Sequence, residues 1–293
     1  MWPLLQIELL KIFRKPRTYI SFGAIAVMVI IIQIALKSDG QSYIEFIVGS
    51  LKDSLEIPYQ HILNGYFVCF VILNLLLIHI PLLIALVAGD SIAGEANMGT
   101  LRLIASKPVS RTELMLAKFG ATIIYTALLL VWLAFISLLL SIMLFGSNDI
   151  LVARNDSLEI IRSNDVLWRY GAAFAFATLA LSTVAALAFL LSVFADNSIG
   201  PIVSTISIVI VFTILSEMQI PLYDRTVKPF LFTSHMLAWK GFFYSKVDAG
   251  GTAIPGTVEN IRAIARSCGV LGLYIAGFVS TAIFVFNKKD ILS

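Results

Sequence analysis

Long apolar runs dominate the pattern of hydrophobic and polar positions along the chain. A helix needs roughly 20 mostly apolar residues to cross a bilayer, and six runs meet that length. They cover residues 19–36, 66–88, 119–145, 171–194, 199–215 and 268–286. Each run must be helical in lipid, because lipid offers no partner for backbone amides and carbonyls. The pattern predicts an all-α, polytopic membrane protein with six transmembrane helices, forming one transmembrane domain over residues 1–293.

The composition supports this interpretation. Hydrophobic residues make up 59% of the chain and charged residues only 13%, whereas soluble domains carry about 25% charged residues. So few charged side chains cannot cover the surface of a soluble globule of this size. The composition therefore excludes a soluble globular domain.

The pattern predicts an amphipathic helix over residues 2–15, before the first run. It lies within an N-terminal segment of residues 1–18. Its apolar face carries Trp2, Leu5, Leu9, Ile12 and Phe13, and its polar face carries Glu8, Lys11 and Lys15. Such a helix lies in the membrane interface, and we expect its lysines to face lipid headgroups. Pro16 then ends it. Two interpretations remain open: a simple orientation anchor, or a mechanical elbow that docks a cytoplasmic partner.

Basic residues gather in the short segments before the first run, between the second and third, and after the sixth. Lysine and arginine in short loops favour the cytoplasmic side. The distribution predicts that both termini are cytoplasmic.

The connection of residues 89–118 differs from a tight turn, because it is amphiphilic and reads as helix, break and helix. Pro108 disfavours helical backbone at the residue before it, and Ser110 with Glu113 has the spacing of a capping box. The first helix carries charge at Asp90, Glu95 and Arg102, with apolar residues on its other side. A rigid, two-faced helix of this kind suits a partner that pushes on it. A plain structural hairpin is the alternative.

This connection resembles the cytoplasmic coupling loop of type-2 ATP-binding-cassette (ABC) exporter permeases. That pattern has an acidic residue, Gly-Thr-Leu, an apolar stretch, Pro-x-x-Arg and a lysine at the start of the next span. The matching residues are Glu95, Gly99, Thr100, Leu101, Pro108, Arg111 and Lys118. The resemblance implies that residues 89–118, including Arg102, form a coupling helix that contacts an ATPase.

The resemblance also implies the partners. The chain contains no G-x-x-x-x-G-K-[ST] phosphate loop, so we expect no ATP hydrolysis by that mechanism and no cofactor in this chain. ATP and Mg²⁺ would bind a separate ABC ATPase subunit, present in two copies. A second permease chain, forming a homodimer, and membrane lipid complete the expected partners, and no nucleic acid is expected. The expected location is the plasma (inner) membrane.

Polar residues inside the spans are candidates for a substrate path, because ionisable and polar groups are rare in lipid. They are Asn74 and His79 in the second span, and Ser204 and Ser207 in the fifth. Hydrogen bonding across helices and helix packing are the alternatives. The three histidines lack the spacing of metal ligands, so no metal site is expected.

Two outer loops are expected, over residues 147–169 and 218–267. The second is rich in proline and aromatic residues, which suits a segment at the outer interface. It would be a re-entrant gate, as the resemblance implies, or an interfacial anchor.

Two other functions remain as alternatives to an exporter subunit. A gradient-driven secondary transporter would work without an ATPase, but would usually carry paired ionisable residues or broken helices in its spans. An intramembrane enzyme such as a protease would need acidic partners for His79, and none is apparent in the spans.

Overall fold

The computed structural model describes most of the chain. The described residues are 1–48, 62–100, 109–154, 157–218, 223, 226–246 and 253–289.

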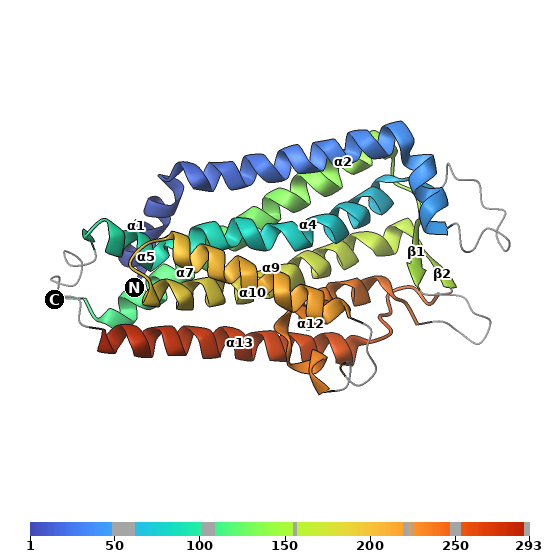
Figure 1. Cartoon of the computed structure of the whole chain (residues 1–293). Helices are drawn as coiled ribbons and strands as arrows, with labels where there is room; N and C mark the ends of the chain where they lie inside the picture. Colours follow the sequence, from blue (N-terminus) through green and yellow to red (C-terminus); the bar gives the residue numbers. More distant parts are fainter. Residues whose placement is uncertain are drawn as a thin grey trace.

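Helices form almost all of the described structure (Figure 1). The long ones are α2 (Pro16–Val48), α4 (Gly65–Ala88), α7 (Arg111–Ala134), α9 (Ser163–Phe194), α10 (Ile199–Glu217) and α13 (Ile261–Lys288). A π-helical turn (Phe135–Leu139) joins α7 to α8 (Leu140–Phe145), so that one continuous helix runs from Arg111 to Phe145. The short helices are α1 (Trp2–Phe13), α5 (Asp90–Asn97), η3 (Lys228–Phe230), α12 (Phe232–Met236) and η4 (Leu237–Phe243).

Five of the described helices are long and apolar enough to cross a membrane, and the count rises to six if α4 is one bent span. The prediction of a helical, multi-pass membrane protein is confirmed to that extent. The two parts of α4, Gly65–Leu77 and His79–Ala88, meet at an angle of 51°. Pro81 explains the bend, because proline has no N–H for the carbonyl of Leu77 and its ring crowds that carbonyl.

Helix α9 lies at the centre of the bundle. Its most apolar stretch is 67% buried, whereas the corresponding stretches of α2, α10 and α13 are 28%, 22% and 22% buried. Small residues such as Ala180, Ala185 and Ala188 line α9 and let its neighbours pack closely. The surrounding helices therefore keep apolar faces exposed, as helices in contact with lipid do.

The outer loop expected over residues 147–169 is instead a β-hairpin followed by the first turns of α9. Strand β1 (Ile150–Arg154) pairs antiparallel with β2 (Ser157–Ile161), with Ile150 opposite Ile161. The all-α prediction did not include this hairpin. It satisfies its backbone groups by pairing the strands with each other, which is possible where the chain leaves the bundle.

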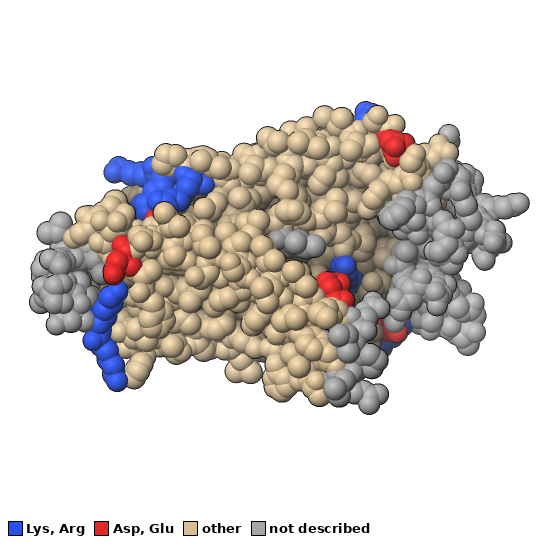
Figure 2. All heavy atoms as spheres, viewed as in Figure 1, with Lys and Arg blue, Asp and Glu red and all other residues tan. Residues whose placement is uncertain are grey.

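The two ends of the bundle carry different features. Helices α1 and α5 and the C-terminal end of α13 share one end, whereas the hairpin lies at the other (Figure 1). On the face drawn in Figure 2, charged side chains gather toward the two ends, and a broad uncharged belt separates them. This belt is the surface expected of a protein that spans a membrane.

Candidate functional site

Four charged side chains meet between α1, α5 and α7, and we call them the ion cluster: Glu8, Lys11, Glu95 and Lys118. The ammonium of Lys11 lies 2.6 Å from Oε1 of Glu8 and 2.8 Å from Oε1 of Glu95. The ammonium of Lys118 lies 2.9 Å from Oε2 of Glu8 and 2.7 Å from Oε1 of Glu95. Each cation therefore bridges both carboxylates, and the charges of the four residues cancel.

Three of the four members of the ion cluster are largely shielded from solvent, whereas the side chain of Lys11 is 35% exposed. The side chain of Lys118 is 1% exposed, and those of Glu95 and Glu8 are 7% and 9% exposed. Removing one member of such a buried cluster leaves an uncompensated charge, which destabilises a protein by roughly 3–5 kcal/mol. The cluster therefore fixes α5 against the two helices that flank it.

The surroundings shift the pKa values of two members. Burial alone would lower the pKa of Lys11, but hydrogen bonds and attraction from Glu8 and Glu95 raise it above its ordinary value. Burial alone would raise the pKa of Glu95, but the ammonium groups of Lys118 and Lys11 lower it. Both residues are thus held in their charged forms.

A second set of charges extends the connection to α2 and α10. The carboxylate of Asp90, at the start of α5, lies 2.5 Å from the ammonium of Lys15 and 2.8 Å from the guanidinium of Arg17. The hydroxyl of Ser198, which precedes α10, donates to the same carboxylate. Gly94 is needed here, because a Cβ at that position would collide with Asp90.

Ser192 of the central helix α9 holds the start of α5. Its hydroxyl accepts hydrogen bonds from the backbone amides of Ile92 and Ala93, at 3.2 and 2.9 Å, and donates to the carbonyl of Gly89 at 2.7 Å. These amides begin a helix and would otherwise lack partners. Helix α5 is thus attached to α1, α7 and α9 at once.

Arg111, which the resemblance assigned to the coupling loop, contacts the end of α13. Its guanidinium donates to the carbonyls of Asn287 and Lys289, at 3.2 and 2.9 Å, and more weakly to that of Phe286. A cation at a helix C-terminus satisfies free carbonyls and interacts favourably with the helix dipole. Ser110 caps α7 as predicted, because its hydroxyl accepts from the amide of Glu113 at 3.1 Å.

The other predicted coupling residues have different surroundings. Glu95 is buried in the ion cluster, whereas Gly99 is exposed and has a φ of 69° that favours glycine. Thr100 donates to the carbonyl of Glu95 at 3.3 Å. The remaining residues lie outside the described part of the chain: Leu101, Arg102 and Pro108.

Helix α1 turns its polar face inward. Lys11 and Lys15 pair with carboxylates of α5, so the expectation that these lysines face lipid headgroups is wrong. Buried carboxylates hold an ammonium more strongly than exposed headgroups in water do. The predicted apolar face is divided: Trp2 is 66% exposed, while Leu5 packs near Gly120 of α7. The three further residues of that face are partly buried: Leu9, Ile12 and Phe13.

The four candidates for a substrate path do not come together. Asn74 is partly buried and lines a small cavity, and its amide donates to the carbonyl of Phe70 at 3.3 Å. His79 is exposed, with its ring within 2.7 Å of the carbonyl of Leu75. Ser204 and Ser207 lie on the exposed face of α10.

Arg169 joins α9 to the segment after α10, and the sequence did not predict this role. It is fully buried and pairs with Asp165 at 2.6 Å. Its guanidinium also donates to the carbonyls of Phe242 and Thr257, at 2.5 and 2.9 Å, and to the hydroxyl of Ser245 at 3.1 Å. These contacts fasten the segment after α10 onto α9. The four-residue spacing of Asp165 and Arg169 was the available signal.

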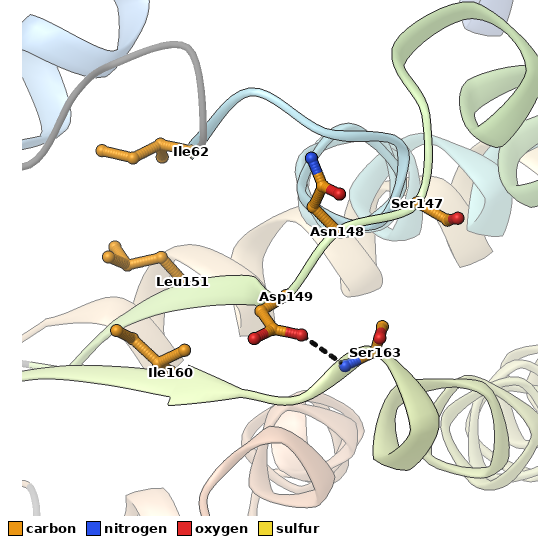
Figure 3. Close-up of a pocket in the computed structure, with 7 residues that line it drawn as sticks. All are labelled: Ile62, Ser147, Asn148, Asp149, Leu151, Ile160 and Ser163. Carbon is orange, nitrogen blue, oxygen red and sulfur yellow. Dashed lines mark hydrogen bonds between the residues drawn. The ribbon is translucent and has the colours of Figure 1, made fainter.

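A cavity of about 400 Å³ lies beside the hairpin at the other end of the bundle (Figure 3). Asp149 is the ionisable residue among its described lining residues, and its carboxylate accepts from the amide of Ser163 at 2.8 Å. Within the described residues, no group of three or more His, Cys, Asp or Glu could hold a metal ion. The ion cluster is therefore the better candidate for a functional site.

Comparison with known families gives one match. Residues 24–292 match the family described as "Protein of unknown function (DUF2705)". The chain belongs to this family. No curated protein matches the chain. The family match takes in α5, α7 and α9, so Glu95 and Lys118 fall within it, whereas Glu8 and Lys11 of α1 precede it.

Proposed function

We propose that the chain is the transmembrane permease subunit of an ABC exporter. It would move a substrate across the plasma membrane with energy from ATP hydrolysis on a separate nucleotide-binding subunit. The observation that carries the proposal is the attachment of α5, a short helix that directly follows the second apolar helix, to α1 and α7 through the ion cluster. The resemblance of residues 89–118 to a coupling loop supports it.

The ion cluster gives this proposal a mechanism. A partner that displaces α5 would also displace Glu95, and Glu95 is bound to Lys11 of α1 and Lys118 of α7. Separating these charges in a poorly solvated site is costly, so the three helices would move together. Helix α7 continues as an apolar helix to Phe145, and it would carry the displacement toward the far end of the bundle.

In this mechanism, the residues that contact the ATPase differ from the residues that pass its movement on to the other helices. Asn97, Met98 and Gly99 are exposed at the C-terminal end of α5, and they offer the contact surface for an ATPase. Glu95 acts as a positioning residue inside the permease. Arg111 has a similar role, because it joins the start of α7 to α13.

The assembly follows from the same proposal. Two permease chains would form a homodimer with two ATPase subunits, with both termini in the cytoplasm. Basic residues gather at the end of the bundle that holds α1, including Lys11, Arg14 and Lys15, which agrees with that orientation.

Copurification tests the proposal. A tagged chain, extracted gently from its native membrane, should bring a nucleotide-binding subunit with it. Met98→Asp should lose that subunit, because it puts a charge on the exposed contact surface. Asn148→Asp, which introduces the same charge at an exposed position beside the hairpin, should retain it. Recovery of the chain without any ATPase under conditions that preserve membrane complexes would refute the proposal.

One observation favours the alternative, a secondary transporter driven by an ion gradient. Broken helices surround the substrate sites of many such transporters, and α4 bends by 51° near Pro81. Purified chain in liposomes, without any ATPase, would then accumulate substrate when a proton or sodium gradient is applied. The exporter proposal expects no such accumulation.

A further inference from the structure

A second, smaller cavity lies beside the bend of α4, where α4, α9 and α10 meet α12 and η4. Its volume is about 40 Å³. A single water occupies roughly 10–15 Å³ by this measure, so the cavity has room for about three heavy atoms. Its polar lining residues are Asn74, Thr213, Ser216, Thr233, Trp239 and Lys240.

Trp239 brings an unused hydrogen-bond donor to this cavity. The residue is 1% exposed, and its indole N–H has no hydrogen-bond partner among the described residues. The rings of Phe70 and Phe243 pack against it, at centroid distances of 5.5 and 6.0 Å. A buried donor without an acceptor is destabilising, and buried tryptophans usually find one. An acceptor supplied from outside the chain would remove this penalty.

Lys240 adds a positive charge to the same lining. Its ammonium forms no ion pair with another described residue, although the charge of Glu217 is close enough to act on it. Burial lowers the pKa of Lys240, and Glu217 offsets this effect only in part. A neighbouring anion would stabilise the charged form of this lysine.

The remaining polar groups of the lining are largely engaged with one another. The hydroxyls of Ser216 and Thr233 lie 2.6 Å apart, and each lies within hydrogen-bonding distance of the carbonyl of Phe212, at 2.7 and 2.9 Å. The amide of Asn74 bonds to its own helix. Trp239 keeps a donor without a partner among the described residues, and Lys240 forms no ion pair with them, so both call for a ligand that accepts hydrogen bonds.

We propose that this cavity binds the anionic oxygens of a carboxylate group, with the indole N–H of Trp239 and the ammonium of Lys240 as donors. The volume fits a carboxylate, which has three heavy atoms. The same chemistry is present in a free organic anion and in the headgroup of an anionic lipid. The inference concerns only this cavity, and it holds for an ABC permease and for a secondary transporter alike.

Nuclear magnetic resonance of the indole N–H groups tests the proposal directly. The chain has four tryptophans, so protein labelled with ¹⁵N-tryptophan gives few signals, and Trp239→Phe assigns the relevant one. Trp132 donates to the carbonyl of Phe22 at 3.1 Å, and Trp168 donates to Asp165 at 2.5 Å. Their signals serve as internal controls for the fold.

The protein is placed in phosphatidylcholine nanodiscs and titrated with sodium acetate, or with neutral acetamide, at constant sodium chloride. We expect acetate to move the Trp239 signal downfield in a saturable way, and acetamide to leave it in place. In a second arm, phosphatidylserine, whose headgroup carries a carboxylate, replaces part of the phosphatidylcholine without acetate. A shift in this arm alone identifies a lipid headgroup as the ligand, and a shift with acetate alone identifies a free anion.

Lysine variants complete the test. Lys240→Gln should raise the half-saturating concentration at least tenfold, and Lys240→Arg should restore binding. Lys246→Gln, at an exposed position outside the cavity, should bind as the parent does. The proposal is overturned if neither acetate nor phosphatidylserine moves the Trp239 signal of the parent protein. It is also overturned if Lys240→Gln, with its Trp132 and Trp168 signals unchanged, binds as tightly as the parent.

Discussion

Glu95 pairs through only one of its two carboxylate oxygens in the ion cluster. Both ammonium groups of the ion cluster approach its Oε1, while its Oε2 is buried without a hydrogen-bond partner among the described residues. The negative charge of Glu95 is therefore paired with two ammonium groups, but Oε2 accepts no hydrogen bond from the described residues.

Glu95→Gln should destabilise the protein by about 3 kcal/mol, because Lys118 and Lys11 would share the single remaining carboxylate of Glu8. Thermal unfolding in a mild detergent measures the effect. Glu113→Gln is the matched control, since Glu113 is exposed in the first turn of α7, and its loss should cost less than about 1 kcal/mol. Equal effects of the two variants would show that the ion cluster does not stabilise the bundle.

Arg169→Gln should loosen the segment that follows α10. The guanidinium bonds to the carbonyls of Phe242 and Thr257, and glutamine cannot replace so many donors. We expect limited proteolysis to cleave within residues 242–257 at least tenfold faster. Arg162→Gln, at an exposed position before α9, should leave cleavage unchanged. An unaltered cleavage rate in Arg169→Gln would mean that other contacts hold this segment.

At the scale of elements, the long apolar helices could be predicted from the sequence, and the roles of the polar residues could not. Residues 171–194 and 268–286 both lie within observed helices. Lipid offers no hydrogen-bond partners, so the backbone of a long apolar segment must form its hydrogen bonds within a helix. The burial of Glu95 depends on Lys11 and Lys118, which are 84 and 23 positions away in the chain. Local pattern carries no information about such distant pairing.

The hairpin and the buried Arg169 were missed for a related reason. Residues 150–154 and 157–161 form one short pair of strands, which gives a weak periodic signal. Arginine is almost never fully buried unless it is paired, so Arg169 looked like part of an exposed loop. Apart from Asp165, its partners are two backbone carbonyls and a serine, and these have no signature in a sequence.

The bend of α4 can be tested by removing its cause. Pro81→Ala supplies the missing amide, and a hydrogen bond from it to the carbonyl of Leu77 contributes about 1 kcal/mol. Hydrogen–deuterium exchange around residues 77–85 should slow about fivefold. Pro201→Ala is the matched control, because Pro201 lies in the first turn of α10, where a proline disturbs no helical hydrogen bond. Faster exchange in Pro81→Ala would show that the bend has another cause.

At the scale of the whole molecule, the ion cluster should make stability depend on pH. The pKa of Glu95 is below its ordinary value of 4.5, so unfolding takes up a proton once the pH falls toward that value. Stability should therefore be lost progressively as the pH falls below about 4.5. The pKa of Lys11 is above its ordinary value of 10.5, so stability should also fall as the pH rises beyond about 10.5.

Unfolding midpoints measured from pH 3 to pH 11 in one detergent would test both limbs, and the variants separate them. Glu95→Gln removes the group whose pKa is lowered, so its acid limb should be shallower than that of the parent. Lys11→Gln should flatten the alkaline limb in the same way. An acid limb of unchanged slope in Glu95→Gln would place the responsible carboxylate elsewhere. The two limbs together would then show whether α1, α5 and α7 are held as one unit by charge, as the transmission of movement from α5 to the rest of the bundle requires.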